Sequence, residues 1–174
     1  RALGAVCSMD YEWLPKRSCS RDSLLDSQSK WVVFCPGARW PNKRWPADHF
    51  ASLAANLQLR DNQLRIAIVG NSGDAKLSRT IKEAAPGICM DLSGKTTFTE
   101  LFECLRNARV VVANDSGPLH VAAALNRPLV ALYGPTHPGR TGPYAYPDSI
   151  MSAAVPCAPC QVPYCVNEIE RECM

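Results

Sequence analysis

The sequence predicts an α/β protein with a Rossmann-like, doubly wound parallel sheet. Short apolar segments recur along the chain, and each is followed by an amphipathic helical pattern. The apolar segments are continuous rather than alternating, which is typical of strands buried on both faces of a parallel sheet. Strands that alternate with helices in this way form βαβ units. The expected strands are Trp31–Cys35, Arg65–Val69, Ile88–Leu92, Val110–Ala113 and Leu129–Tyr133, with a sixth near Ile150–Val155.

Helices are expected between these strands because apolar residues recur there at helical spacing. The residues that mark the four helices are Phe50, Leu53, Ala54 and Leu57; Leu77, Ile81 and Ala84; Phe98, Leu101, Phe102 and Leu105; and Leu119, Ala122, Ala123 and Leu125. Pro86 and Gly87 end the second helix, and Thr97 and Glu100 have the spacing of a capping box at the start of the third. The fourth helix is expected over about Pro118–Leu125.

Composition and charge limit the class of protein. The chain has 174 residues, of which 47% are hydrophobic and 20% charged, as in an ordinary globular domain. No apolar run approaches the roughly 18 residues of a membrane helix. A net charge of +3 is too small to indicate a nucleic-acid partner and suits an anionic ligand or an anionic membrane surface. Residues 1–30 are expected to be a lead-in, with a short strand or hairpin near its start and a linker or surface loop over Ser18–Lys30, and residues 31–174 form the domain.

The nine cysteines are unevenly placed. Cys35, Cys89 and Cys104 lie in apolar segments and are expected to be buried as small hydrophobic side chains. Four more lie in the C-terminal tail with the spacing C-x2-C-x4-C-x7-C, at Cys157, Cys160, Cys165 and Cys173. Four thiolates can hold zinc, but this spacing differs from the paired C-x2-C units of zinc ribbons. A metal site, disulfides and free thiols therefore remain open for the tail, and the cysteine usage as a whole indicates a reducing compartment.

The candidate binding residues follow the strands, because ligands of doubly wound sheets bind beyond the carboxyl ends of the strands. The segment after the first strand, Pro36–Pro46, contains Gly37, which permits close approach of the backbone to a ligand. The same segment carries the cations Lys43 and Arg44, which suit phosphate. A solvated loop with packed tryptophans is the alternative interpretation.

The segment after the fourth strand is a candidate phosphate-binding helix start. Asp115 or Ser116 can cap the helix, and Gly117 leaves the amides of the first turn open to an anion. His120 lies on the first turn, where it could face the ligand. A plain helix cap with a packed histidine explains the same residues without a ligand.

Two further strand ends supply weaker candidates. Asp74, after the second strand, could accept hydrogen bonds from ribose hydroxyls or cap the next helix. Thr136 lies in a Gly- and Pro-containing loop that could wall a nucleobase pocket or simply connect two elements. The sequence has no Walker A motif, no G-x-S-x-G elbow and no paired carboxylates of the glycosidase kind. It therefore offers a nucleotide-diphosphate cradle, while the catalytic residues stay unassigned.

The order of these motifs resembles glycosyltransferase family 9, the bacterial ADP-heptose:lipopolysaccharide heptosyltransferases. The similarity spans residues 31–174 and includes the cysteine tail. The segments that carry it are PGA at 36–38, KRWP at 43–46, NDSGPLHVAAA at 114–124 and YGPT at 133–136. The resemblance implies the C-terminal half of a two-domain GT-B enzyme, the half that binds the donor.

The resemblance also implies roles for particular residues. Lys43 would pair with the donor phosphate, and Ser116 and Gly117 would offer amides to the diphosphate. Asp115 and His120 would shape the sugar side, and the acidic residue after the second strand would face the nucleoside. The full set expected at the donor is Gly37, Lys43, Arg44, Asp74, Asp115, Ser116, Gly117, His120 and Thr136.

The activity implied by the resemblance is inverting transfer of heptose from ADP-heptose to the lipopolysaccharide inner core, without a cofactor. The family's catalytic base lies in an N-terminal Rossmann-like domain, and both that domain and the family's C-terminal helix are expected to lie outside this chain. The expected location is the cytoplasm, at the inner face of the inner membrane. Two other classes remain open: a non-catalytic nucleotide-binding or interaction module, and a structural domain stapled by metal at the tail cysteines.

Overall fold

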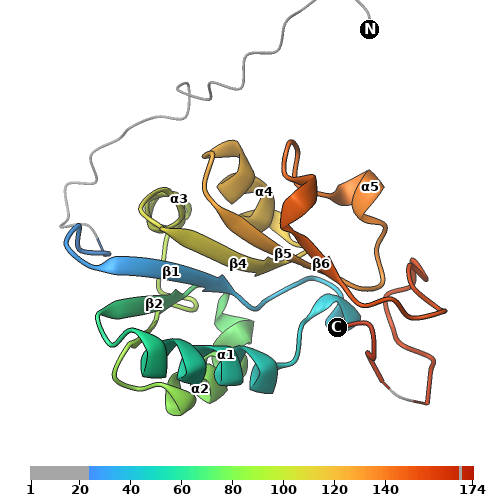
Figure 1. The fold of residues 1–174 in the computed structure, drawn as a ribbon, viewed down its shortest axis with the longest axis horizontal. Coiled ribbons are helices and arrows are strands. Elements are labelled where there is room, and N and C mark those ends of the chain that lie inside the picture. The colour runs from blue at the N-terminus through green and yellow to red at the C-terminus, as the bar shows by residue number, and fades with distance from the viewer. Residues whose placement is uncertain (1–23, 169) are drawn as a thin grey trace, which may run out of the picture.

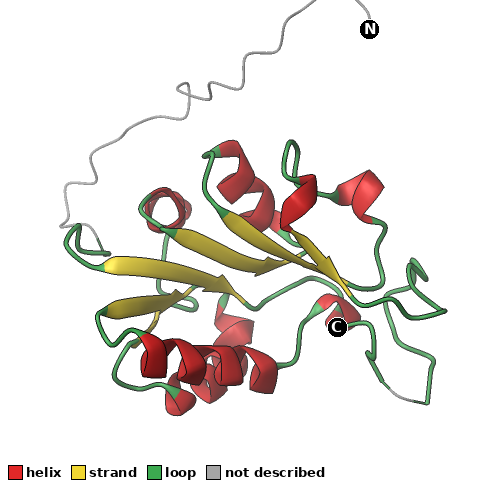
Figure 2. Ribbon diagram, viewed as in Figure 1, coloured by secondary structure: helices red, strands yellow, loops and turns green. Residues whose placement is uncertain are grey.

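The computed structural model describes residues 24–168 and 170–174, which form one parallel sheet with helices on both faces (Figures 1 and 2). The strands are β1 (Lys30–Cys35), β2 (Leu64–Ile68), β3 (Cys89–Asp91), β4 (Val110–Asn114), β5 (Leu129–Tyr133) and β6 (Ile150–Ser152). Their order in the sheet is β3-β2-β1-β4-β5-β6. The chain thus builds outward from β1 on one side and then adds β4 to β6 on the other, which confirms the Rossmann-like fold class.

Helices connect the strands as the periodicity predicts. They are α1 (Ala47–Arg60), α2 (Ala75–Ala84), α3 (Phe98–Arg106), α4 (Gly117–Ala124) and α5 (Pro138–Thr141), with short 3₁₀ turns η1 (Pro41–Lys43), η2 (Ser72–Asp74) and η3 (Pro147–Ser149). The short α5 and the 3₁₀ turns have no apolar period and were not expected. None of the described helices is long and apolar enough to cross a membrane. The sixth strand is shorter than predicted and ends at Ser152.

Both faces of the sheet carry a core, which explains the continuous apolar strands. In β1, Val33 packs in a cluster with residues of α3 and α4, and Phe34 packs in a cluster with residues of α1 and α2. These two helix layers cover opposite faces of the sheet (Figure 1). The parallel register places Val33 beside Ala67 of β2 and Val111 of β4. Because successive side chains of a strand point to opposite faces, each apolar residue of β1 is buried on one side or the other.

The start of α3 shows one confirmed prediction and one wrong one. The capping box is present: the Thr97 backbone N–H donates to Glu100 Oε2 at 2.8 Å, and the Glu100 N–H donates to Thr97 Oγ1 at 3.3 Å. Phe98, which the periodicity places on the packed face, is instead 84% exposed, whereas Leu105 near the other end of the helix is buried. As the first residue of α3, Phe98 lies beside the loops that follow β1 and β2, outside the helix layer that buries Leu105.

The lead-in differs from the expected surface loop at one position. Leu25 is buried in the core, although the described residues around it are mostly exposed. The Trp31 indole N–H donates to the Asp26 carbonyl oxygen at 3.0 Å, which fixes the approach to β1. The strand or hairpin expected near the start of the chain lies outside the described residues.

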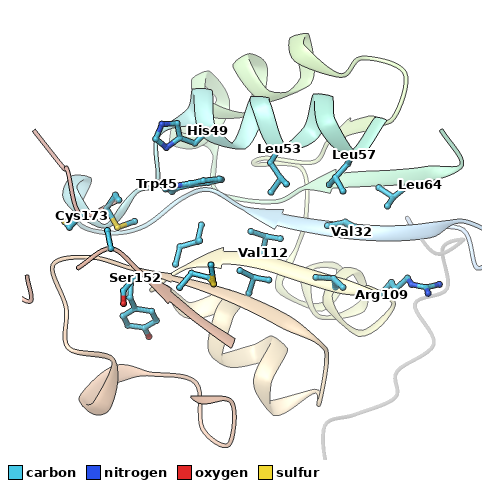
Figure 3. A pocket seen from close by; sticks show the side chains of 17 residues that line it. Val32, Trp45, His49, Leu53, Leu57, Leu64, Arg109, Val112, Ser152 and Cys173 are labelled. Carbon is cyan, nitrogen blue, oxygen red and sulfur yellow. The ribbon is translucent and has the colours of Figure 1, made fainter. Parts of the chain in front are cut away.

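A groove of about 760 Å³ runs between α1 and the neighbouring face of the sheet (Figure 3). Leu53 and Leu57 of α1 line one side of it, and Val112 of β4 lines the sheet side. Arg109 and Cys173 mark its two ends. A parallel sheet is normally covered on both faces, so this groove is an apolar surface that the described residues leave open.

Candidate functional site

The loops that carry the sequence candidates meet at the carboxyl edge of the sheet. β1 and β4 are neighbours in the sheet, although they are far apart in the sequence. The helices that follow them, α1 and α4, cover opposite faces (Figure 1). The loops after β1 and β4 therefore diverge and leave a crevice between them, which is the topological switch point where doubly wound sheets bind ligands.

Lys43 and Asp115 form a salt bridge across this switch point. Lys43 Nζ lies 2.7 Å from Asp115 Oδ2, and the side chain of Asp115 is only 5% exposed. The Thr136 hydroxyl donates to the same oxygen at 2.7 Å. Lys43 Nζ also lies 4.8 Å from the centroid of the Trp40 ring, within cation–π range. Because an ammonium has three donor hydrogens, Lys43 can hold Asp115 and still donate to an anion.

Asp115 is surrounded by further polar groups on its other oxygen. The Tyr133 hydroxyl donates to the Thr141 carbonyl oxygen at 2.5 Å and lies 3.3 Å from Asp115 Oδ1. Burial, and then the charge of Asp115, raise the pKa of Tyr133, so this phenol stays a donor. His120 Nε2 lies 3.9 Å from Asp115 Oδ1, and the His120 side chain is about half exposed. Asp115 thus holds Lys43 with one oxygen and has polar groups close to the other.

The start of α4 presents an open surface. Ser116 is the N-cap residue, but its side chain makes no capping hydrogen bond, so the side-chain cap expected from the sequence is wrong. Ser116 Oγ is buried without a hydrogen-bond partner. A Cβ built on Gly117 meets nothing within 4 Å. Gly117 is the first residue of α4 and supplies its first amide, whereas Pro118 has no N–H. The open space beside Gly117 lies at the positive end of the helix, which suits an anion.

Asp74 is buried between two glycines. Its Oδ2 accepts from the Asn71 N–H at 3.0 Å and closes a capping box at η2, whereas its Oδ1 is buried without a hydrogen-bond partner. Arg44 Nη2 lies 4.0 Å from this second oxygen. A Cβ on Gly37 or Gly70 would overlap the Asp74 carboxylate. The cap expected at the start of the next helix is wrong, because the Asp74 side chain makes no capping hydrogen bond to α2 and bonds back to Asn71 instead. The contact with a ribose stays a prediction.

Gly37→Ala is expected to destabilise the fold, because the new methyl group would overlap the Asp74 carboxylate. Overpacking of this kind costs about 1–3 kcal/mol and would lower the midpoint of chemical denaturation. Gly87→Ala is the matched control, since the nearest atom to its new methyl is Gln58 Oε1 at 3.6 Å. The control is expected to change the free energy of unfolding by less than about 0.5 kcal/mol. Equal denaturation midpoints for the two variants would contradict the role assigned to Gly37.

A pocket of about 570 Å³ lies between the loops that follow β1, β2, β3 and β4. Its lining includes Gly37, Arg39, Arg44, Asp74, Thr97, Phe98 and Ser116. The structure therefore brings part of the expected set around one pocket and gathers Lys43, Asp115, His120 and Thr136 into the polar network that adjoins Ser116. The larger groove of Figure 3 is lined mostly by apolar side chains, whereas charged side chains also line the smaller pocket, so the smaller pocket is the candidate site.

Two asparagines hold the site loops together, and the sequence assigned no role to either. Asn114 is fully buried; its side chain donates to the Pro36 carbonyl oxygen at 2.7 Å and accepts from the Trp45 N–H at 3.0 Å. It thereby fixes both ends of the loop that carries Lys43. The Asn42 side chain donates to the Val162 carbonyl oxygen at 2.6 Å, which joins that loop to the cysteine tail. These partners are distant in sequence, so no local pattern could have indicated them.

The seven cysteines within the described part of the chain are free thiols. Cys35, Cys89 and Cys104 are buried as expected, and burial raises the pKa of both Cys89 and Cys104 to about 11. In the tail, Cys157 and Cys160 are exposed. Among the described residues, no three ligating side chains converge to hold a metal ion. The four tail cysteines thus form no disulfide with one another.

Basic side chains at the switch point of a Rossmann-like sheet are typical of the class of domains that bind nucleotides or other phosphates. Residues 9–169 match the family model of glycosyltransferase family 9 (heptosyltransferase). Because this match covers most of the chain, the protein belongs to glycosyltransferase family 9, as the motifs indicated.

Individual relatives agree with the family assignment. The lipooligosaccharide heptosyltransferase 2 of Haemophilus influenzae is 44% identical over 117 residues, which cover 64% of this chain and 33% of that protein. The structure of the E. coli ADP-heptose lipopolysaccharide heptosyltransferase II has a TM-score of 0.68 and 37% identity, covering 76% of this chain and 41% of that chain. The E. coli heptosyltransferase WaaC with ADP has a TM-score of 0.61 and 28% identity, and the match covers 74% of this chain and 38% of that chain. The chain thus spans between 33% and 41% of the length of these relatives.

Proposed function

We propose that this chain is the donor-binding domain of a heptosyltransferase, which binds ADP-heptose for transfer of the heptose to the lipopolysaccharide core. The observation that carries the proposal is the Lys43–Asp115 pair beside the open start of α4. Lys43 supplies a point charge and α4 supplies the positive end of a helix dipole, and both suit a diphosphate. The identities of the sugar, the acceptor and the nucleotide in this proposal come from the names of the relatives, one of which was solved with ADP.

The chemistry of the transfer explains why a charged cradle is needed. When the bond between the anomeric carbon and the phosphate oxygen breaks, ADP leaves with additional negative charge. Lys43 and the Gly117 amide can stabilise this charge more strongly than they stabilise the intact donor, which lowers the barrier. Asp115, which accepts a hydrogen bond from Thr136, holds Lys43 in place beforehand, so little reorganisation is needed during the reaction.

Both carboxylates of the described site are buried, which keeps them from an acceptor hydroxyl. Asp115 is bonded to Lys43, and Asp74 closes the capping box of η2. A general base must lie within about 2.6–3.2 Å of the hydroxyl that it deprotonates. The proposal therefore assigns the base and the acceptor cleft to an N-terminal Rossmann-like domain of the complete enzyme. The proposed location is the cytoplasm, at the inner face of the inner membrane.

The test separates donor binding from transfer. We expect the 174-residue chain to bind ADP in calorimetry, and to show no transfer when it is incubated with ADP-heptose and a deep-core lipopolysaccharide acceptor. A two-domain heptosyltransferase serves as the positive control for the acceptor. A chain that fails to bind ADP would overturn the donor role. Transfer at a rate near that of the two-domain enzyme would overturn the assignment of the base to another domain.

A further inference from the structure

An exposed aromatic ring lies at the edge of the candidate pocket. Phe98 is 84% exposed, whereas Phe34 and Phe50 are fully buried. The capping box of Thr97 and Glu100 fixes the backbone at the start of α3, so the position of Phe98 is set by the fold. A single exposed apolar residue needs no explanation by itself. Phe98, however, also lines the 570 Å³ pocket, together with Asp74 and Ser116.

The two ends of the pocket differ in chemistry. Ser116 lies at the open start of α4, beside Asp115 and its partner Lys43. This is the end that suits the diphosphate. The other polar end is contributed by Asp74 of η2 and by the residues that begin α3. If the diphosphate occupies the first end, the nucleoside extends toward the second, where Phe98 is the one aromatic side chain among the described residues that line the pocket.

We propose that the ring of Phe98 is the platform on which the nucleobase of the donor stacks, and that this contact favours a purine. The inference rests on the proposed function. An exposed phenyl ring offers a flat apolar face, and a base that covers it removes two apolar surfaces from water at once. A purine has the larger ring system and covers more of this face than a pyrimidine does.

The test compares ligands that contain the base with one that lacks it. Phe98→Ala is expected to weaken the binding of ADP about tenfold, the scale of one base–aromatic stack, and to leave the binding of inorganic pyrophosphate unchanged. Phe98→Tyr should retain the affinity for ADP. The wild-type chain should bind ADP more tightly than UDP, and Phe98→Ala should narrow this difference. Calorimetry measures each of these affinities.

Leu59→Ala is the matched control, because Leu59 is an equally exposed apolar residue (85%) on α1 and does not line the pocket. Its affinity for ADP should equal that of the wild-type chain. If the wild-type chain and Phe98→Ala bind ADP equally well, Phe98 is not the stacking platform, while the proposed function stands. If the wild-type chain binds neither ADP nor pyrophosphate, the proposed function itself fails. Equal losses for ADP and pyrophosphate in Phe98→Ala would place the ring at the phosphates and overturn the platform as well.

Discussion

Lys43→Ala is expected to weaken the binding of ADP by about 10- to 150-fold, the equivalent of about 1.5–3 kcal/mol for one charge-assisted hydrogen bond. The same substitution should lower the free energy of unfolding by about 3 kcal/mol, because it leaves the Asp115 carboxylate buried without its cation. Calorimetry measures the first effect and chemical denaturation the second. A variant with unchanged affinity for ADP would remove Lys43 from the site.

A second substitution separates the effect of Lys43→Ala on ADP affinity from its effect on stability. Asp115→Asn removes the buried charge that Lys43→Ala leaves unpaired, so the double variant should regain most of the lost stability. It should not regain affinity for ADP, because the cation that contacts the phosphate is still missing. If the double variant binds ADP normally, the loss in Lys43→Ala would reflect a disturbed fold and not a lost contact. If its stability stays as low as that of Lys43→Ala, the unpaired charge is not the cause of the destabilisation.

The fold could be predicted from the sequence because the strands are buried on both faces. β5 begins and ends at the predicted residues, Leu129 and Tyr133, and the capping box of Thr97 with Glu100 is present as its spacing indicated. Both signals are local: one is a continuous apolar run, and the other is a pair of residues three positions apart. The exposure of Phe98 could not be predicted in the same way, since the helical period does not show where the packed layer ends.

The candidate site was predicted less completely, because its partners come from different loops. The motif order indicated Lys43 and Asp115 separately, but only the sheet topology brings them within 2.7 Å. The same holds for Thr136, which a strand and a helix separate from Asp115. The role of Asn114 depends on contacts with Pro36 and Trp45, more than 60 residues away in sequence. Residue types and spacing identify such candidates, whereas their hydrogen bonds follow from tertiary structure.

The glycines of the site show why a residue type alone does not define its role. At Gly37 a side chain would overlap Asp74, so this glycine is needed for the packing of the domain. At Gly117 a side chain would meet nothing within 4 Å, and no positive φ requires a glycine there. The fold itself therefore does not need a glycine at position 117. In the proposed function, the diphosphate of the donor occupies the open space beside Gly117.

Gly117→Val is therefore expected to abolish donor binding while leaving the fold intact. The branched side chain would fill the space before the first amide of α4 and keep the phosphate from reaching it. The variant loses both the charge-assisted contact with this amide and the close approach of the phosphate to the backbone. The affinity for ADP should therefore fall by about 100-fold or more. The free energy of unfolding should change by less than about 1 kcal/mol, the range of helix propensities. Calorimetry with ADP and chemical denaturation of the same variant test both statements.

The size of the new side chain provides an internal control. Gly117→Ala adds one methyl group to the same open space, so its affinity for ADP should lie between those of the wild-type chain and Gly117→Val. A loss of affinity that grows with side-chain volume, at constant stability, is the result expected for a ligand that occupies this space. If Gly117→Val binds ADP as the wild-type chain does, the diphosphate lies elsewhere in the crevice, and Lys43 alone would have to account for its binding.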